Sequence, residues 1–334
     1  MVFSRLGKQR FGSKYKKWLS YLDKYALGVA SLALLRLRSK ANTIWHIIDH
    51  GNAPYAAILP RERTVITCHD CIAIDEALTG RTGEKVGRFG LLLQNAIRHH
   101  LSRVAIVAAV SKATLDDLNR LVTATATRRV VVLNGLLFPF SPLSRPHAEA
   151  ALAGTRIRTD APFLFTIGSN LKRKNRSGAI ASFEWLKQHR LDQTLRLIIA
   201  GEPWSDELRA RIMQSPYAND IVEAGSISNN ELQAAYSLAA AVIFPSLAEG
   251  FGLPVIEAQA CGATVVINDI APLREVGSDG VFWADAQDPA KFGACIAAAL
   301  DDNSGLEAKA LANAKRFDTA EWAAQYSRLY ASLV

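Results

Sequence analysis

The order of apolar runs along the 334-residue chain constrains its fold more than any other feature. Short runs rich in Val, Ile and Leu alternate with helical patterns such as those at 86–100 and 112–121. The strand candidates form two series: 44–48, 64–68, 104–110 and 129–133, then 163–168, 195–201, 220–225, 241–245, 263–268 and 280–284. Because this alternation is typical of βαβ units, it predicts two parallel sheets with helices on their faces.

A proline-rich segment without apolar periodicity, 138–150, separates the two series. We therefore expect an N-terminal Rossmann-like domain at 1–145, a linker at 146–160 and a C-terminal ligand-binding domain at 161–316. A hydrophobic content of 49% is enough for two cores in a chain of this length. In such folds the ligand lies outside the carboxyl ends of the strands, here in a cleft that the two domains face.

The net charge of +8 comes from one terminal segment. Residues 1–40 contain ten Lys and Arg residues and one acidic residue, Asp23, so the rest of the chain is close to neutral. A nucleic-acid-binding domain would spread its basic face through the fold, so we expect no nucleic-acid partner. The apolar run at 25–35 is shorter than the roughly 20 residues that span a bilayer. The segment is either a basic helix on an anionic membrane surface or a solvated helix packed by one face.

The cysteines and the start of the chain favour a cytoplasmic location, either free or peripheral on the inner face of the membrane. Four cysteines do not form a disulfide framework in a chain of this length, and no cleavable signal segment is evident. Cys68 and Cys71 have the CxxC spacing, but no second pair accompanies them. We therefore expect neither a metal site nor a cofactor.

The stretch "FPSLAEGFGLPVIEAQACG", residues 244–262, places two glutamates around a glycine-rich turn. The apolar residues before it predict a strand end, and Pro254 suits a first helical turn because its missing N–H is not needed there. Glu249 then lies in the loop and Glu257 about one turn into the helix. The free N–H groups of such a helix start favour anionic or hydroxyl-rich ligands.

A basic turn, "GSNLKRKNRS", follows the strand candidate 163–168. Lys172, Arg173 and Lys174 stand directly before a predicted helix, where cations and helix N–H groups together suit a pyrophosphate. The turn lacks the Gly-Lys-Ser/Thr ending of a Walker loop, and the alternative is a solvated basic surface. Gly225, at another strand end, allows close approach of a flat ligand.

These segments together resemble the donor-binding domain of the family 4 glycosyltransferases, the retaining enzymes of the GT-B fold. The resemblance rests on "GSNLKRKN", "GSISNNELQAAYSLA" and "FPSLAEGFGLPVIEAQACGATVVINDIAPLREVGSDGVFWAD", and covers about residues 60–330. In the first half, "TVITCHD", "AVSKATLDDL" and "VVLNGL" are similar to the family's strand ends. "FDTAEWAAQYSRLY" is similar to its closing helix, which implies a helix at 317–334 that returns toward the N-terminal domain.

The resemblance implies roles for individual residues. Glu257 accepts hydrogen bonds from the ribose hydroxyls, Glu249 faces the donor sugar, and Lys174 neutralises the leaving diphosphate, with Lys172 or Arg173 as a second cation. His69 is presented toward the sugar from the N-terminal domain, with a hydrogen bond to Asp70 or backbone as the alternative. The other donor-binding positions implied are Gly250, Phe251, Gly252, Leu253, Gly168, Ser169, Gly225 and Ile227. Ser169 stands where many members carry an arginine.

The family also implies a function, a hexosyl transfer from a nucleotide-diphosphate sugar to a glycan or lipid-linked glycan, in surface polysaccharide or lipopolysaccharide assembly. Mannosyl transfer is one form of it. One alternative is a donor-binding but inactive interaction protein. A sugar epimerase or a dehydrogenase is weaker, since no G-x-G-x-x-G follows the first strand of either half.

The start of the chain departs from the family pattern. Family members begin with a strand and a glycine-rich loop, and neither is found before Ile44. Either the N-terminal sheet is incomplete, or the chain lacks its natural start.

Overall fold

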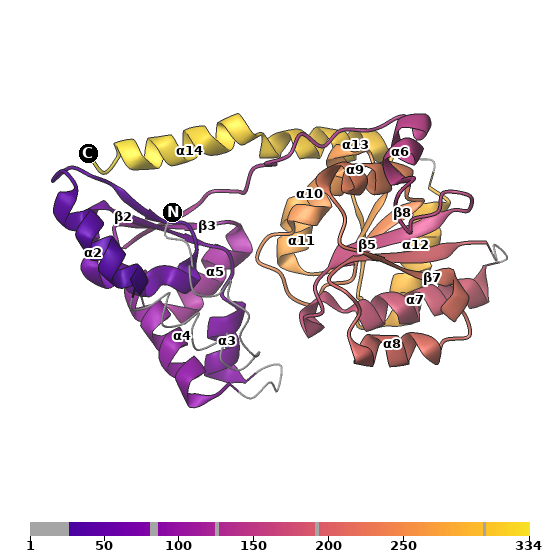
Figure 1. Cartoon of the computed structure of the whole chain (residues 1–334), viewed down its shortest axis with the longest axis horizontal. Coiled ribbons are helices and arrows are strands. Elements are labelled where there is room, and N and C mark those ends of the chain that lie inside the picture. The colour runs from indigo at the N-terminus through magenta and orange to yellow at the C-terminus, as the bar shows by residue number, and fades with distance from the viewer. Residues whose placement is uncertain (1–26, 81–85, 124–126, 191–193, 303–304) are drawn as a thin grey trace. The chain divides into compact units, whose positions relative to one another are not determined.

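The computed structural model describes residues 27–80, 86–123, 127–190, 194–302 and 305–334. These residues form two compact units (Figure 1). The first unit contains the residues up to Val110, Thr114–Val132 and Tyr326–Val334, and the second contains Ser111–Ala113 and Leu133–Gln325. The expected N-terminal start at 1–40 lies outside the described residues up to position 26.

The first unit is built on a four-stranded parallel sheet in the order β1-β2-β3-β4. Its strands are β1 (Trp45–Ile47), β2 (Thr64–Cys68), β3 (Ile106–Ala109) and β4 (Arg128–Val131). Every residue of β2 and β3 is buried. Strands covered on both faces have continuous apolar runs, which is why the sequence pattern located them.

Helices and two short 3₁₀ segments surround this sheet. They are α2 (Gly28–Arg38), η2 (His50–Ile58), η3 (Arg61–Arg63), α3 (Ile72–Thr79), α4 (Arg88–Leu101) and α5 (Lys112–Leu121). A core of buried apolar side chains that includes Ile66, Ile74 and Leu118 joins α3, α4 and α5 to the sheet. Burial of each such side chain contributes about 1.5–3 kcal/mol to folding.

The second unit contains a six-stranded parallel sheet in the order β10-β9-β8-β5-β6-β7. Its strands are β5 (Phe163–Gly168), β6 (Arg196–Gly201), β7 (Ile221–Gly225), β8 (Ala241–Phe244), β9 (Val265–Asn268) and β10 (Phe282–Ala284). The chain adds β6 and β7 on one side of β5 and then crosses to add β8 on the other side. The strand order therefore reverses between β5 and β8, and ligands in sheets of this type bind beyond the carboxyl ends at that point.

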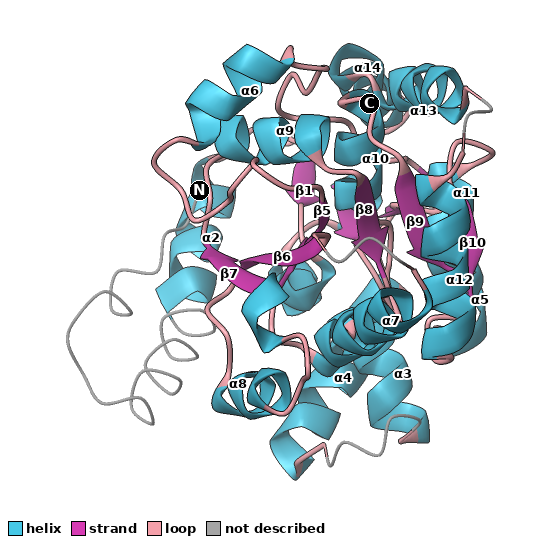
Figure 2. Ribbon diagram, turned by 90° about the vertical axis from the view of Figure 1, so that its right-hand side faces the viewer, coloured by secondary structure: helices cyan, strands magenta, loops and turns pink. Residues whose placement is uncertain are grey.

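Helices cover both faces of the second sheet (Figure 2). On one side lie α6 (Arg145–Leu152), α9 (Asn229–Leu238), α10 (Leu253–Ala260) and α13 (Leu306–Ala314); on the other lie α7 (Arg176–His189), α8 (Asp206–Met213) and α12 (Pro289–Leu300). The unit also contains α11 (Ala271–Gly277), η4 (Lys172–Lys174), η5 (Ala218–Asp220) and η6 (Lys315–Phe317). With helices on both faces, every residue of the central strands β8 and β9 is buried.

The segment expected to be a linker, 146–160, contains most of α6. Pro146 lies in the first turn of α6, where its missing N–H costs nothing, so the proline that indicated irregular structure starts a helix instead. Ala148 and Leu152 are buried, and α6 packs against α9. The linker interpretation was therefore wrong for residues 146–152.

The final helix, α14 (Thr319–Ala331), contributes its C-terminal part to the first unit. The Tyr330 hydroxyl lies 2.7 Å from His46 Nδ1, and Thr67 Oγ1 lies 2.8 Å from His46 Nε2. The Tyr326 hydroxyl lies 2.7 Å from Thr67 Oγ1. Burial, and then the charge of His69, lower the pKa of His46 to about 4. A neutral imidazole thus ties the end of α14 to β1 and β2 at physiological pH.

The helices of the described ranges include none with both the length and the apolar character that a bilayer crossing requires.

Candidate active site

The loops that follow β5 and β8 meet at the point where the strand order of the second sheet reverses. The loop after β5 carries the basic turn, and the loop after β8 carries Glu249. The Leu247 N–H donates to the Arg173 carbonyl oxygen at 2.7 Å, which joins the two loops directly. The topology thus brings together two segments that lie about 75 positions apart in the sequence.

Glu249 holds two cations at this point. Lys174 Nζ lies 2.5 Å from Glu249 Oε1, and Arg173 Nη1 donates to Glu249 Oε2 at 2.9 Å and to the Ala248 carbonyl oxygen at 3.0 Å. The side chains are 12% exposed for Glu249, 19% for Lys174 and 29% for Arg173. Two partly buried cations that share one carboxylate leave a net positive charge at the carboxyl edge of the sheet. This geometry favours Arg173 over Lys172, which is exposed, as the partner of Lys174.

Asn175 fixes the basic turn in place. Its backbone has φ 52°, a left-handed conformation that asparagine tolerates better than most residues. Its side chain accepts a hydrogen bond from the Gly178 N–H and caps α7, while its amide donates to the carbonyl oxygens of Pro245 at 3.1 Å and Ala286 at 3.2 Å. The Asn175 side chain therefore connects the start of α7 to the ends of β8 and β10. These contacts hold the neighbouring Lys174 at the carboxyl edge of the second sheet.

Glu257 lies in the second turn of α10, as the sequence predicted. Among the described residues, its hydrogen-bond donor is the hydroxyl of the fully buried Tyr236, which donates to Glu257 Oε2 at 3.2 Å. Burial raises the pKa of the Glu257 carboxyl, and the hydrogen bond from Tyr236 acts against that rise. A carboxylate has about four acceptor sites, so this one retains capacity for the hydroxyls of a ligand.

The glycine-rich turn at 250–253 is suited to contact a ligand through its backbone rather than through its side chains. Gly252 precedes α10 with φ 114°, and a Cβ there would lie 2.7 Å from Leu273 Cδ2, so only glycine fits. The Phe251 side chain is buried and meets Phe317 edge to face at 5.8 Å between ring centroids. Of the implied donor contacts at 250–253, those made through backbone N–H groups are compatible with this packing.

The remaining sequence-predicted residues of this unit lie at neighbouring strand ends. Gly168 ends β5, and a Cβ on the adjacent Gly201 would lie 2.2 Å from the Gly168 carbonyl oxygen. Ser169 follows Gly168 and is partly exposed. Gly225 ends β7 with φ 71° and open space where a Cβ would be, and Ile227 is partly exposed two residues later. All of these positions therefore share the carboxyl edge of the second sheet with Lys174 and Glu249.

His69 belongs to the first unit, directly after β2. Its ring is exposed, and Nε2 lies 2.8 Å from the Ile48 carbonyl oxygen, which can only accept, so Nε2 carries the proton. Its backbone N–H donates to His50 Nδ1 at 3.3 Å. The backbone hydrogen bond that we considered as an alternative role is thus present, and the predicted contact with a donor sugar stays a prediction.

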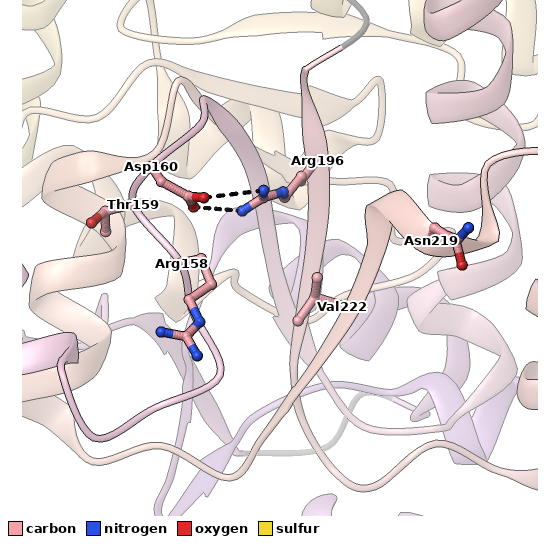
Figure 3. A pocket seen from close by; sticks show the side chains of 6 residues that line it. All are labelled: Arg158, Thr159, Asp160, Arg196, Asn219 and Val222. Carbon is pink, nitrogen blue, oxygen red and sulfur yellow. Dashed lines mark hydrogen bonds and ion pairs between the residues drawn. The ribbon is translucent and has the colours of Figure 1, made fainter.

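A second hollow lies at the opposite, amino edge of the second sheet (Figure 3). It has a volume of about 530 Å³ and is lined by Arg158, Thr159, Asp160, Arg196, Asn219 and Val222. Asp160 and Arg196 pair with each other across it at 2.7 Å. Asp160 therefore neutralises Arg196, and the hollow shares no residue with the candidate active site. Within the described ranges no group of three or more metal-ligating side chains gathers.

The sequence reasoning missed three residues that organise the site: Asn175, Arg176 and Tyr236. Each lies inside "KRKNRS" or "QAAYSL", but its role depends on partners such as Pro245, Ala200 and Glu257, which lie on other elements of the fold. A sequence signal exists for Asn175, because Asn before a helix is a common cap. By residue type alone, Arg176 looks like any other basic residue and Tyr236 like any other core residue.

Comparisons with known proteins bear on the family and the fold of the chain. The family model described as glycosyl transferases group 1 matches residues 148–317. The O-antigen chain mannosyltransferase B of Escherichia coli is 27% identical over 317 residues, which cover 91% of this chain and 80% of that protein.

Solved structures share the fold at low sequence identity. The sucrose-phosphate synthase of Thermosynechococcus elongatus matches with a TM-score of 0.77 at 19% identity, over 98% of this chain and 82% of that chain. The Anabaena protein Alr3699/HepE, solved in complex with UDP and glucose, matches with a TM-score of 0.75 at 18% identity, over 98% of this chain and 84% of that chain. The expected fold class, GT-B with two Rossmann-like parallel sheets, is confirmed, and the family match over half of the sequence shows that the chain belongs to the group 1 glycosyl transferases.

Proposed function

We propose that this glycosyltransferase moves a hexose, with mannose as the first candidate, from a nucleotide-diphosphate sugar to a glycan or lipid-linked glycan, with retention of anomeric configuration. The proposed setting is O-antigen-like surface polysaccharide assembly, which the name of the E. coli relative supports. The observation that carries the proposal is the pair of cations, Arg173 and Lys174, held by Glu249 where the strand order reverses. The match to the glycosyl transferase family disfavours an epimerase or a dehydrogenase, and no relative supports an inactive binding protein.

In this proposal the diphosphate of the donor lies against Lys174 and Arg173, and the ribose hydroxyls donate to Glu257. As the bond between the sugar C1 and the phosphate oxygen breaks, negative charge grows on the diphosphate and positive charge on the sugar ring. Cations fixed beside the leaving group stabilise that charge more in the transition state than in the ground state. The acceptor hydroxyl attacks the same face of C1, and the departing phosphate oxygen takes its proton. No step requires a metal.

Thermal-shift measurements with UDP-, GDP- and ADP-sugars test this donor site first. A ligand that binds only the folded protein raises the unfolding midpoint with concentration. We expect one nucleotide series to raise it, followed by slow hydrolysis of the matching sugar donor in the absence of acceptor. Binding without turnover across a broad acceptor panel would support the inactive alternative, and the absence of any shift would contradict the donor site itself.

Glu249→Gln is expected to separate binding from turnover. In the free protein the Glu249 carboxylate neutralises the same two cations that a diphosphate would contact, so it competes with the ligand. Its loss should leave the affinity for the free nucleoside diphosphate unchanged or higher, while kcat with the sugar donor falls by about tenfold or more, because a carboxylate facing the sugar is gone. Calorimetric titration and initial rates measure the two effects. A joint loss of affinity and kcat would mean that Glu249 only supports the loop.

Residues 27–40 also support contact with an anionic membrane surface. Helix α2 has no acidic residue in its first turn, two arginines in its last turn, and the exposed leucines Leu34, Leu35 and Leu37. Apolar and basic side chains on one exposed helix suit an anionic bilayer surface, where each basic residue contributes about 1 kcal/mol.

Co-sedimentation with phosphatidylglycerol and with phosphatidylcholine vesicles tests this contact. We expect binding to the anionic vesicles alone, weakened by salt, and reduced by Leu37→Asp. Met213→Asp is the matched control, since Met213 is equally exposed on the second unit. Equal binding to both lipids, or equal binding of both variants, would contradict a role for α2.

A further inference from the structure

Arg176 is a buried cation beneath the loop after β5. It is the first residue of α7 and only 7% exposed. Its Nη1 donates to Asn170 Oδ1 at 2.6 Å and to the Glu202 carbonyl oxygen at 3.0 Å. Its Nη2 donates to the carbonyl oxygens of Ala200, at 3.0 Å, and of Gly168. One guanidinium therefore holds four acceptors from two chain segments.

Those two segments are the ends of neighbouring strands. Gly168 and Asn170 belong to the end of β5 and its loop, whereas Ala200 and Glu202 belong to the end of β6. The Asn170 N–H also donates to Glu202 Oε2 at 2.8 Å. The rigid fork of a guanidinium matches such a set of acceptors, which a lysine with its single nitrogen cannot reproduce. Arg176 therefore fixes the conformation of the loop that carries Ser169 and leads to Lys174.

The charge of Arg176 is not neutralised by a bonded carboxylate. Its four hydrogen-bond acceptors are neutral oxygens, and the buried Nε–H has no hydrogen-bond partner within the part of the chain that the structure describes. Burial lowers the pKa of the guanidinium, while the nearby charges of Glu202 and Glu223 oppose that fall, and arginine stays charged at any physiological pH. A buried cation on neutral acceptors is unfavourable by itself, and an anion bound beyond the loop would offset that cost.

We propose that Arg176 is a positioning residue for the diphosphate of the donor. It sets the backbone of 168–170 against the phosphates and adds positive potential from beneath the loop, without touching the ligand. This inference rests on the proposed function, because it requires a nucleoside diphosphate at this edge of the sheet. It predicts that substitution of Arg176 weakens binding of the nucleoside diphosphate more than binding of the nucleoside alone.

Affinities of Arg176→Lys and Arg176→Gln for UDP, GDP and ADP, and for the matching nucleosides, test this role. Calorimetry measures the diphosphates and ligand-observed NMR measures the nucleosides. For the diphosphate that binds the wild type, we expect a loss of about tenfold in Arg176→Lys, where the charge remains, and a larger loss in Arg176→Gln. Affinity for the nucleoside should change less than about twofold. With the sugar donor, KM should rise more than kcat falls.

Arg190→Lys is the matched control, at the other end of the same helix. Arg190 donates to the Ala297 carbonyl oxygen at 3.1 Å and pairs with Asp301 at 2.9 Å, so its loss lowers stability without reaching the site. Asn170→Ala is a second probe at an exposed position, and it removes one acceptor of Arg176 even if the Arg176 variants fail to fold. We expect it to weaken diphosphate binding by a few-fold in the same phosphate-dependent way.

Two results would overturn the inference, and they differ from each other. If the wild type binds a diphosphate and the folded Arg176→Lys and Asn170→Ala variants bind it equally well, or lose nucleoside affinity in proportion, Arg176 has no positioning role. If the wild type binds none of the three diphosphates, the donor site itself is wrong.

Discussion

Replacing Lys174 with alanine is expected to lower kcat/KM for the nucleotide-sugar donor by about 10²- to 10³-fold, the usual cost of removing one group that stabilises developing negative charge. The ammonium of Lys174 is held at the carboxyl edge of the sheet by Glu249, with 19% of the side chain exposed. Its loss should weaken binding of the free diphosphate and lower kcat as well, since the diphosphate is more negative when it leaves. Initial rates and calorimetric titration of the product diphosphate measure the two parts.

The control for Lys174→Ala is Lys291→Ala. Lys291 lies on α12 with 69% of its side chain exposed and pairs with Asp288 three residues before it. Exposed pairs of this kind contribute about 0–1 kcal/mol to stability, so the control should behave like the wild type. Wild-type diphosphate affinity in Lys174→Ala would show that the ion pair with Glu249 is purely structural.

Glu257→Gln is expected to weaken nucleotide binding by about 10- to 100-fold, because a charged acceptor for the ribose hydroxyls becomes a neutral one. The same change should stabilise the free protein at neutral pH. Burial raises the pKa of Glu257, which means that keeping it ionised costs folding free energy, while glutamine can still accept the hydrogen bond from Tyr236. Opposite effects on binding and on stability are the signature of a buried carboxylate retained for a ligand.

The pH dependence of stability checks the sign of that argument. The pKa of Glu257 is higher in the folded state than its usual value near 4.5, so the folded protein binds more protons between the two values. The ionised Glu257 carboxylate therefore lowers the stability of the folded protein above its folded pKa. Below about pH 4 the carboxyl is protonated in both states, and the wild type and Glu257→Gln should then be equally stable. Thermal unfolding at pH 4 to 8 should show an excess stability of Glu257→Gln that shrinks as the pH falls. An equal or lower unfolding midpoint at pH 7 would contradict the assignment.

The sequence was sufficient for the ten strands of the described residues. Both sheets are parallel, and their central strands, such as β2, β3, β8 and β9, are buried and almost continuously apolar. It also placed Glu249 in a loop and Glu257 in a helix, since Pro254 and the glycines mark the start of α10. The contact between Glu249 and Arg173 could not be predicted from the sequence, because it depends on which strands are neighbours in the sheet. The pairing of β5 with β8 is set by tertiary structure, and local secondary-structure propensities do not predict it.

Two further features show where local patterns fail. Pro146 was interpreted as part of a linker, although proline is equally compatible with the first turn of α6. Arg176 could not be distinguished from the exposed Lys172 by residue type, because its burial comes from carbonyl oxygens contributed by two strands. The residue types in a sequence do not indicate which backbone carbonyl groups a side chain will contact, so such a residue can be recognised only in the structure.

The central claim is that the second sheet binds an activated sugar and that the enzyme transfers it with retention. NMR observation of the first-formed product from a GDP-, UDP- or ADP-hexose, whichever raises the unfolding midpoint, tests that claim most directly. Our account predicts turnover by the wild type, a kcat/KM about 10²- to 10³-fold lower in Lys174→Ala, and a first-formed product with the anomeric configuration of the donor. A kcat/KM in Lys174→Ala equal to that of the wild type, or a first-formed product with inverted configuration, would contradict it.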